Sequence, residues 1–133
     1  MTEHFQILVV DDDAEDQLIL DSYFKEVGVH GVVGYRDNGK EALRYLEDIN
    51  GDVPLPRLIV LDLNMPILNG TQTLMHIKKN ARLKNIPVII FSTSENENEK
   101  RKCLSLGANE YLVKPTNYGD GLKLVKKFSS YIA

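Results

Sequence analysis

The residues of this sequence that could do chemistry follow directly after short apolar runs. Three aspartates, Asp11, Asp12 and Asp13, follow the run ILVV, and Asp62 follows the run LIVL. Two further runs are followed by Ser92 and Lys114. Carboxylates, a hydroxyl and an ammonium group together could bind a hard cation and handle a phosphoryl group.

The clustering of carboxylates would need compensation if these run ends meet in space. Two carboxylates about 4 Å apart repel each other by about 4 kcal/mol at an effective dielectric constant of 20. A cation or protonation would have to offset this repulsion, and oxygen ligands without a nearby histidine or cysteine favour Mg²⁺. The three histidines of the chain show no metal-ligand spacing. In such a site Asp62 would attack a phosphorus atom, while Lys114 and Ser92 would stabilise the phosphoryl oxygens.

The elements that must position these residues alternate along the chain. Short apolar runs predict buried strands, at residues 5–10, 32–35, 58–61, 87–91 and 110–113. Apolar residues at steps of three and four predict amphipathic helices, at residues 14–27, 40–49, 71–80 and 95–106 and in a last segment around Leu122, Val125, Phe128 and Ile132. This alternation predicts a doubly wound α/β fold, in which parallel strands end at one edge of the sheet.

Three local expectations accompany this assignment. The apolar stripe of the first helix consists of Leu18, Ile19, Tyr23, Phe24 and Val27. Asp13 should cap that helix, because an aspartate before a helix accepts hydrogen bonds from its first amides. The helix at 95–106 is polar in its first two turns, so we expect it to dock loosely on the sheet.

Length and composition restrict the class of protein. The 133 residues suit a single domain covering residues 1–133, and 43% hydrophobic with 26% charged residues are typical of a globular chain. The net charge of −3 argues against nucleic-acid binding. Because no apolar run approaches the roughly 20 residues of a membrane span, and no leader-like segment or cysteine pair is present, we expect a cytoplasmic protein.

Four segments, each at the end of a predicted strand, carry a resemblance to a known family. They are ILVVDDD at 7–13, LDLNMP at 61–66 with NG at 69–70, FSTS at 91–94 and GANEYLVKP at 107–115. Together they resemble the receiver domain of two-component response regulators, of the stand-alone type found in the chemotaxis response regulator. The resemblance implies a flavodoxin-like five-stranded parallel sheet in the order 2-1-3-4-5, with five helices.

The resemblance also implies a metal and phosphoryl site. Asp62 is similar to the aspartate that the family phosphorylates. Asp11 and Asp12 are similar to its acidic pair, with Asp12 a direct ligand of Mg²⁺ and Asp11 acting through water. Asn64 would offer its backbone carbonyl to the same ion, and Asp62 would complete the set of ligands.

Three further positions match the part of the family motif that responds to phosphorylation. Ser92 stands where a threonine or serine moves to meet the phosphoryl group. Tyr111 stands where an aromatic side chain swings inward, and Lys114 matches the family's lysine. The bond between Lys114 and Pro115 is expected to be cis, as is usual in the family.

The function implied is that of a bacterial phosphorylation switch rather than an enzyme. A sensor histidine kinase or a histidine phosphotransfer protein would phosphorylate Asp62 in the presence of Mg²⁺. The signal would reach an unknown downstream protein, or a second copy in a homodimer, through the fourth helix, fifth strand and fifth helix. No DNA-binding domain and no membrane contact are expected. The proline-rich loop at 50–57 resembles that of receivers that partner bacterial phytochromes.

Two alternatives remain at this point. A phosphatase of the haloacid dehalogenase type also uses an aspartate nucleophile with Mg²⁺, but it needs a second carboxylate two positions later, where this chain has Asn64. An interaction module that keeps the fold without being phosphorylated is disfavoured because the set of site residues is complete.

Overall fold

The computed structural model describes residues 4–132, which form one sheet of five parallel strands with helices on both faces. The strands are β1 (Ile7–Val10), β2 (Val33–Arg36), β3 (Leu58–Leu61), β4 (Val88–Ser92) and β5 (Glu110–Val113). Their order in the sheet is β2-β1-β3-β4-β5, and every neighbouring pair is parallel. The predicted fold class and strand order are therefore confirmed.

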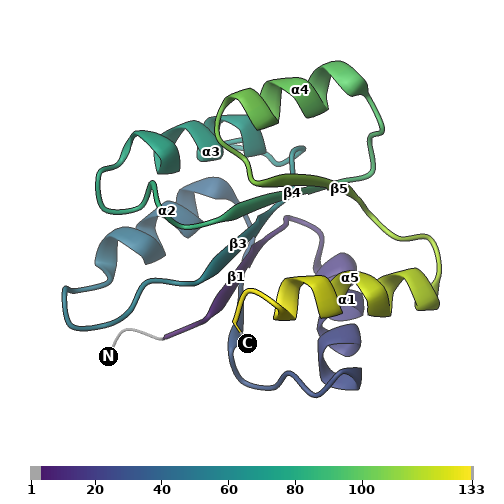
Figure 1. Ribbon diagram of the computed structural model, residues 1–133. Helices are drawn as coiled ribbons and strands as arrows, with labels where there is room; N and C mark the ends of the chain where they lie inside the picture. Colours follow the sequence, from purple (N-terminus) through teal and green to yellow (C-terminus); the bar gives the residue numbers. More distant parts are fainter. Residues whose placement is uncertain (1–3, 133) are drawn as a thin grey trace.

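Helices cover the sheet in two layers (Figure 1). They are α1 (Ala14–Glu26), α2 (Gly39–Asp48), α3 (Gly70–Lys79), α4 (Glu97–Ser105) and α5 (Tyr118–Ser129). Helices α2, α3 and α4 lie on one face, and α1 and α5 lie together on the other. None of the helices within residues 4–132 combines the length and the apolar character needed to span a bilayer.

The central strands are apolar along their whole length because both of their faces are buried. In β1, Leu8 and Val10 pack into the core under α2 and α3, whereas Ile7 and Val9 pack into the core beneath α1 and α5. All four residues are buried. Burial on both sides removes the alternation of polar and apolar residues, so a continuous apolar run is the expected signature of such a strand.

Each helix begins at an aspartate or asparagine whose side chain accepts backbone hydrogen bonds. These N-cap residues are Asp13, Asn38, Asn69, Asn96 and Asn117. The predicted cap at Asp13 is confirmed, since its carboxylate accepts from the amides of Glu15 and Asp16. The start of α1 is thus set immediately after the first acidic segment.

The apolar face of α1 agrees with the prediction at Tyr23, Phe24 and Val27 but differs from it at Leu18 and Ile19. Leu18 and Ile19 are 72% and 50% exposed, and the buried residues of the helix are Leu20 and Phe24. Successive helical residues are rotated by about 100°, so a shift of one or two positions selects another face that also contains apolar residues. Packing against α5 and the sheet selects the face of Leu20 and Phe24.

Two further expectations meet different outcomes. Cys103 is the one buried residue of α4, which agrees with a helix that docks through few contacts. The expectation of a cis bond between Lys114 and Pro115 is wrong, because no cis peptide bond occurs within residues 4–132. The trans form is the intrinsically favoured isomer, by about 0.5–1 kcal/mol for a bond to proline.

Candidate functional site

The site is assembled where β1 and β3 end side by side. Val10 lies opposite Leu61 in the parallel register, so the next residues, Asp11 and Asp62, leave the sheet at the same level. The amide of Asp62 donates to the carbonyl of Val10 at 3.0 Å. Asp11 and Asp62 are only 3% and 8% exposed. Two carboxylates are therefore held together in a largely buried position.

Asp12 completes an acidic cluster with these two residues. Carboxylate oxygens of Asp11, Asp12 and Asp62 lie within 4.8 Å of one another, and Asp12 is exposed to solvent. The candidate ligand atoms are all oxygens, they belong to residues that directly follow β1 and β3, and the side of the cluster at Asp12 is open to solvent. This arrangement fits a hard divalent cation that keeps part of its water shell.

The electrostatics of the cluster also favour the binding of a cation. Burial raises the pKa of Asp62 to about 6, Lys114 opposes this effect, and the nearby charge of Asp11 adds to it. Burial also raises the pKa of Asp11, although a hydrogen bond from Lys114 acts against it. The single ammonium group does not fully compensate the carboxylates, so a bound cation would find excess negative charge here.

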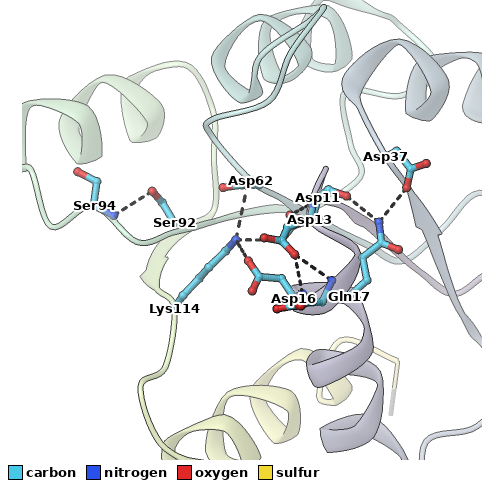
Figure 2. A network of polar contacts seen from close by, with 10 residues as sticks. Asp11, Asp13, Asp16, Gln17, Asp37, Asp62, Ser92, Ser94 and Lys114 are labelled. Atoms are coloured by element: carbon cyan, nitrogen blue, oxygen red, sulfur yellow. Dashed lines mark hydrogen bonds and ion pairs between the residues drawn. The ribbon is translucent and has the colours of Figure 1, made fainter.

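Lys114 reaches into the cluster from the end of β5 (Figure 2). Its Nζ lies 2.9 Å from an oxygen of Asp11, 3.0 Å from one of Asp16 and 3.7 Å from one of Asp62. Burial lowers the pKa of Lys114, but the hydrogen bonds to Asp11 and Asp16 outweigh it and raise the pKa above its usual value. The lysine is therefore a fixed positive charge beside Asp62.

Ser92 and Tyr111 meet at a third residue, Ser94. Ser92 is fully buried at the end of β4, and its Oγ accepts a hydrogen bond from the amide of Ser94 at 3.1 Å. The ring of Tyr111 is buried, and its hydroxyl donates to the carbonyl of Ser94 at 2.8 Å. The backbone of Ser94 thus connects the serine at the strand end with the tyrosine of β5.

Asn64 lies in the loop between β3 and α3. Its backbone amide interacts with the Asp62 carboxylate and lowers the pKa of that group, in opposition to the larger effect of burial. The loop is closed by a hydrogen bond from the amide of Gly70 to the carbonyl of Leu63 at 2.8 Å. Asn64 therefore lies next to Asp62 on a short, closed segment, where its carbonyl could serve as a ligand.

The structure brings Asp11, Asp12, Asp62 and Lys114 into one cluster, whereas the side-chain hydrogen bonds of Ser92 and Tyr111 go to Ser94. It also adds residues that sequence patterns did not reveal. Asp16 and Ser94 were missed, as was Gln17, whose amide donates to the carbonyl of Asp11 at 2.6 Å and to Asp37 at 3.1 Å. Asp16 lies in the first turn of α1, three positions after the cap Asp13, and an acidic residue so close to a strand end could have indicated it. Ser94 acts through its backbone, which leaves no signal in residue type.

Comparison with known proteins gives consistent results. The model of the response regulator receiver domain matches residues 7–126. Response regulator Rcp1 of Synechocystis sp. is 36% identical over 129 residues, covering 94% of this chain and 86% of the relative. A probable methanogenesis regulatory protein, FilR2 of Methanothrix harundinacea, is 34% identical over 128 residues, covering 96% of this chain and 83% of the relative.

Solved structures show the same similarity. The Mn²⁺-bound form of Rcp1 superposes with a TM-score of 0.80 at 33% identity, covering 93% of this chain and 91% of the other. The phosphorylated cyanobacterial phytochrome response regulator RcpA superposes with a TM-score of 0.83 at 32% identity, covering 96% and 93%. One of these similar structures thus holds a divalent metal, and the other is phosphorylated.

Proposed function

The chain belongs to the family of response regulator receiver domains, and from this membership we propose that Asp62 is its phosphoacceptor. The observation that carries the proposal is the placement of Asp62, buried beside Lys114 and within reach of Asp11 and Asp12. The donor would be a phosphohistidine on a sensor histidine kinase or a histidine phosphotransfer protein. A carboxylate oxygen of Asp62 attacks the phosphorus, and the bond from phosphorus to the donor's imidazole nitrogen breaks.

A divalent cation, Mg²⁺ in our proposal, would be held by Asp11, Asp12, Asp62 and the backbone carbonyl of Asn64. The cluster of carboxylate oxygens supports this assignment. When bound, the ion would neutralise charge on the phosphoryl oxygens. Lys114 would donate a hydrogen bond to one of these oxygens, and the hydroxyl of Ser92 would donate to another.

Phosphorylation would act as a switch because it adds negative charge at the buried edge of the sheet. If Ser92 turns toward the phosphoryl group, it gives up its hydrogen bond from the Ser94 amide. The carbonyl of Ser94 accepts from Tyr111, so this change reaches β5. We propose that the surface of α4, β5 and α5 then binds a downstream protein or a second copy of the chain.

Residues 1–133 would act as one receiver unit that signals by binding rather than by catalytic turnover. Asn64 occupies the position where a dehalogenase-type phosphatase would need a carboxylate, which disfavours the enzymatic alternative. RcpA is a cyanobacterial phytochrome response regulator, and the similarity to it supports a light-sensing kinase as the donor. A cytoplasmic location follows if the donor is the cytoplasmic part of such a kinase.

The test is phosphorylation of the full chain by acetyl phosphate, followed by intact mass measurement. With Mg²⁺ the parent should gain the mass of one phosphoryl group, and chelation of the metal should abolish the gain. Asp62→Asn should not be labelled, whereas Asp52→Asn, at an exposed aspartate in the 50–57 loop, should behave like the parent. Labelling of Asp62→Asn at the parent's rate would exclude Asp62 as the acceptor.

A further inference from the structure

The ammonium group of Lys114 is shared unequally among three carboxylates. Its two hydrogen bonds go to Asp11 at 2.9 Å and to Asp16 at 3.0 Å. The oxygen of Asp62 is farther away, at 3.7 Å, which is beyond a good hydrogen bond. The lysine therefore donates to Asp11 after β1 and to Asp16 in α1 rather than to the proposed phosphoacceptor.

Asp16 is held in place by the start of α1. It lies in the first turn of the helix, and its amide donates to the N-cap carboxylate of Asp13 at 3.2 Å. Figure 2 shows the carboxylates of Asp16 and Asp62 on different sides of the lysine amine. The side chain of Asp16 is 40% exposed, whereas that of Lys114 is 12% exposed. Solvent can therefore hydrate the Asp16 carboxylate after it loses the lysine.

From this contact we propose that Asp16 is a positioning residue that competes with the phosphoryl group for Lys114. The inference rests on the proposed function of Asp62. An arriving phosphoryl group is anionic and offers new acceptor oxygens next to Asp62, so the ammonium group is expected to shift toward it. The hydrogen bond to Asp16 opposes that shift, and the negative charge of Asp16 repels the incoming anion.

Asp16 would therefore make the phosphorylated state less stable than it would be if only Asp11 contacted the lysine. Asparagine at position 16 keeps the shape of the side chain but is a weaker acceptor and carries no charge. Asp16→Asn should favour the anion-bound state, because Lys114 is released and one repulsive charge is removed. Asp16→Glu keeps the carboxylate on the same helical turn and should behave more like the parent.

The test uses beryllofluoride, an analogue of the phosphoryl group, in saturating Mg²⁺. The chain contains no tryptophan, so binding is followed through the backbone amide signals of a ¹⁵N-labelled sample. Asp16→Asn should bind beryllofluoride about two- to fivefold more tightly than the parent, the range typical of one partly exposed ion pair. Glu15→Gln is the matched control, since it removes an exposed charge from the same turn and should change the affinity less.

A second measurement reports on Lys114 in the absence of any phosphoryl analogue. The ¹⁵N signal of its ammonium group should shift in Asp16→Asn and stay near the parent value in Glu15→Gln and Asp16→Glu. A purely structural role of Asp16 in starting α1 would leave this signal unchanged. Equal or weaker beryllofluoride binding by Asp16→Asn, or an unshifted ammonium signal, would overturn the inference.

The same experiment separates this inference from the proposed function. If the parent shows no response to beryllofluoride with Mg²⁺, the role of Asp62 as phosphoacceptor is contradicted. The proposed competition between Asp16 and the phosphoryl group for Lys114 is then contradicted as well. If the parent responds and Asp16→Asn binds with the same affinity, the proposed function stands and only the role of Asp16 is contradicted.

Discussion

Gly70 lies directly against the backbone of Asp62. A Cβ atom added at Gly70 would lie 2.2 Å from the carbonyl oxygen of Asp62 and 2.6 Å from the Cα of Leu63. Both neighbours are backbone atoms at the end of β3, and they cannot move without displacing the strand end. The position of the proposed phosphoacceptor therefore depends on a glycine at the start of α3.

Gly70→Ala should destabilise the protein and disturb the site. Forcing a methyl group into this contact is expected to lower the free energy of unfolding by about 1–3 kcal/mol, the usual cost of overpacking. Urea denaturation measures this loss, and acetyl phosphate labelling should be slower. The control is Gly51→Ala, because nothing lies within 4 Å of a Cβ at Gly51. Equal stability of the two variants would contradict the proposed close approach.

Asp62→Asn should stabilise the protein at neutral pH when metal is absent. Burial raises the pKa of Asp62 to about 6, so the Asp62 carboxylate binds a proton more tightly in the native state than in the unfolded state. Stability is therefore lost as the pH rises from about 4 to about 6, and the loss persists above that range. We expect the variant to exceed the parent by about 1–3 kcal/mol at pH 7.5, and the two to converge near pH 4.

Urea denaturation in the presence of a chelator, at both pH values, tests this expectation. Asp52→Asn serves as the control, because its exposed side chain should show no such pH-dependent gain. Addition of Mg²⁺ should stabilise the parent more than Asp62→Asn, since the ion compensates the carboxylate charge. A variant that is less stable than the parent at pH 7.5 without metal would show that Asp62 is not destabilising as a buried anion.

Ile67→Gly should increase stability. Ile67 is 74% exposed in the loop between β3 and α3, and its φ of 71° lies in the left-handed region that disfavours β-branched residues. Such strain costs about 1–3 kcal/mol. Glycine removes the strain, but its greater conformational freedom stabilises the unfolded chain and offsets part of the gain in stability. We expect a net gain of about 1 kcal/mol in urea denaturation, with Ile67→Ala gaining less. A loss of stability in Ile67→Gly would contradict the strained conformation.

Tyr111→Phe should weaken the link between β5 and the segment after β4. The variant keeps the buried ring but loses the hydrogen bond to the Ser94 carbonyl, which is worth about 0.5–1.5 kcal/mol. The amide of Ser94 should also exchange with solvent faster in hydrogen-exchange NMR. Tyr118→Phe, at a residue that is exposed, should cost less than about 0.5 kcal/mol. Unchanged exchange at Ser94 would exclude the proposed link.

The sequence alone determined the features that depend on local patterns. Continuous apolar runs predicted β1 and β3 because strands buried on both faces need apolar residues throughout. The polar residues after those runs, Asp11 and Asp62, could be placed together because parallel strands end at one edge of a sheet. The cap at Asp13 was also predictable, since capping involves only neighbours in the chain.

Only the tertiary structure decided which helix face is buried and which charged side chains on different elements make direct contact. The apolar face of α1 includes Leu20 rather than Leu18, because packing against α5 chooses between overlapping stripes. Asp16 and Lys114 are 98 positions apart, and their ion pair depends on how α1 packs against α5 and the sheet. Periodicity describes one element at a time, whereas the distance between two charges on different elements is set by the packing of the whole core.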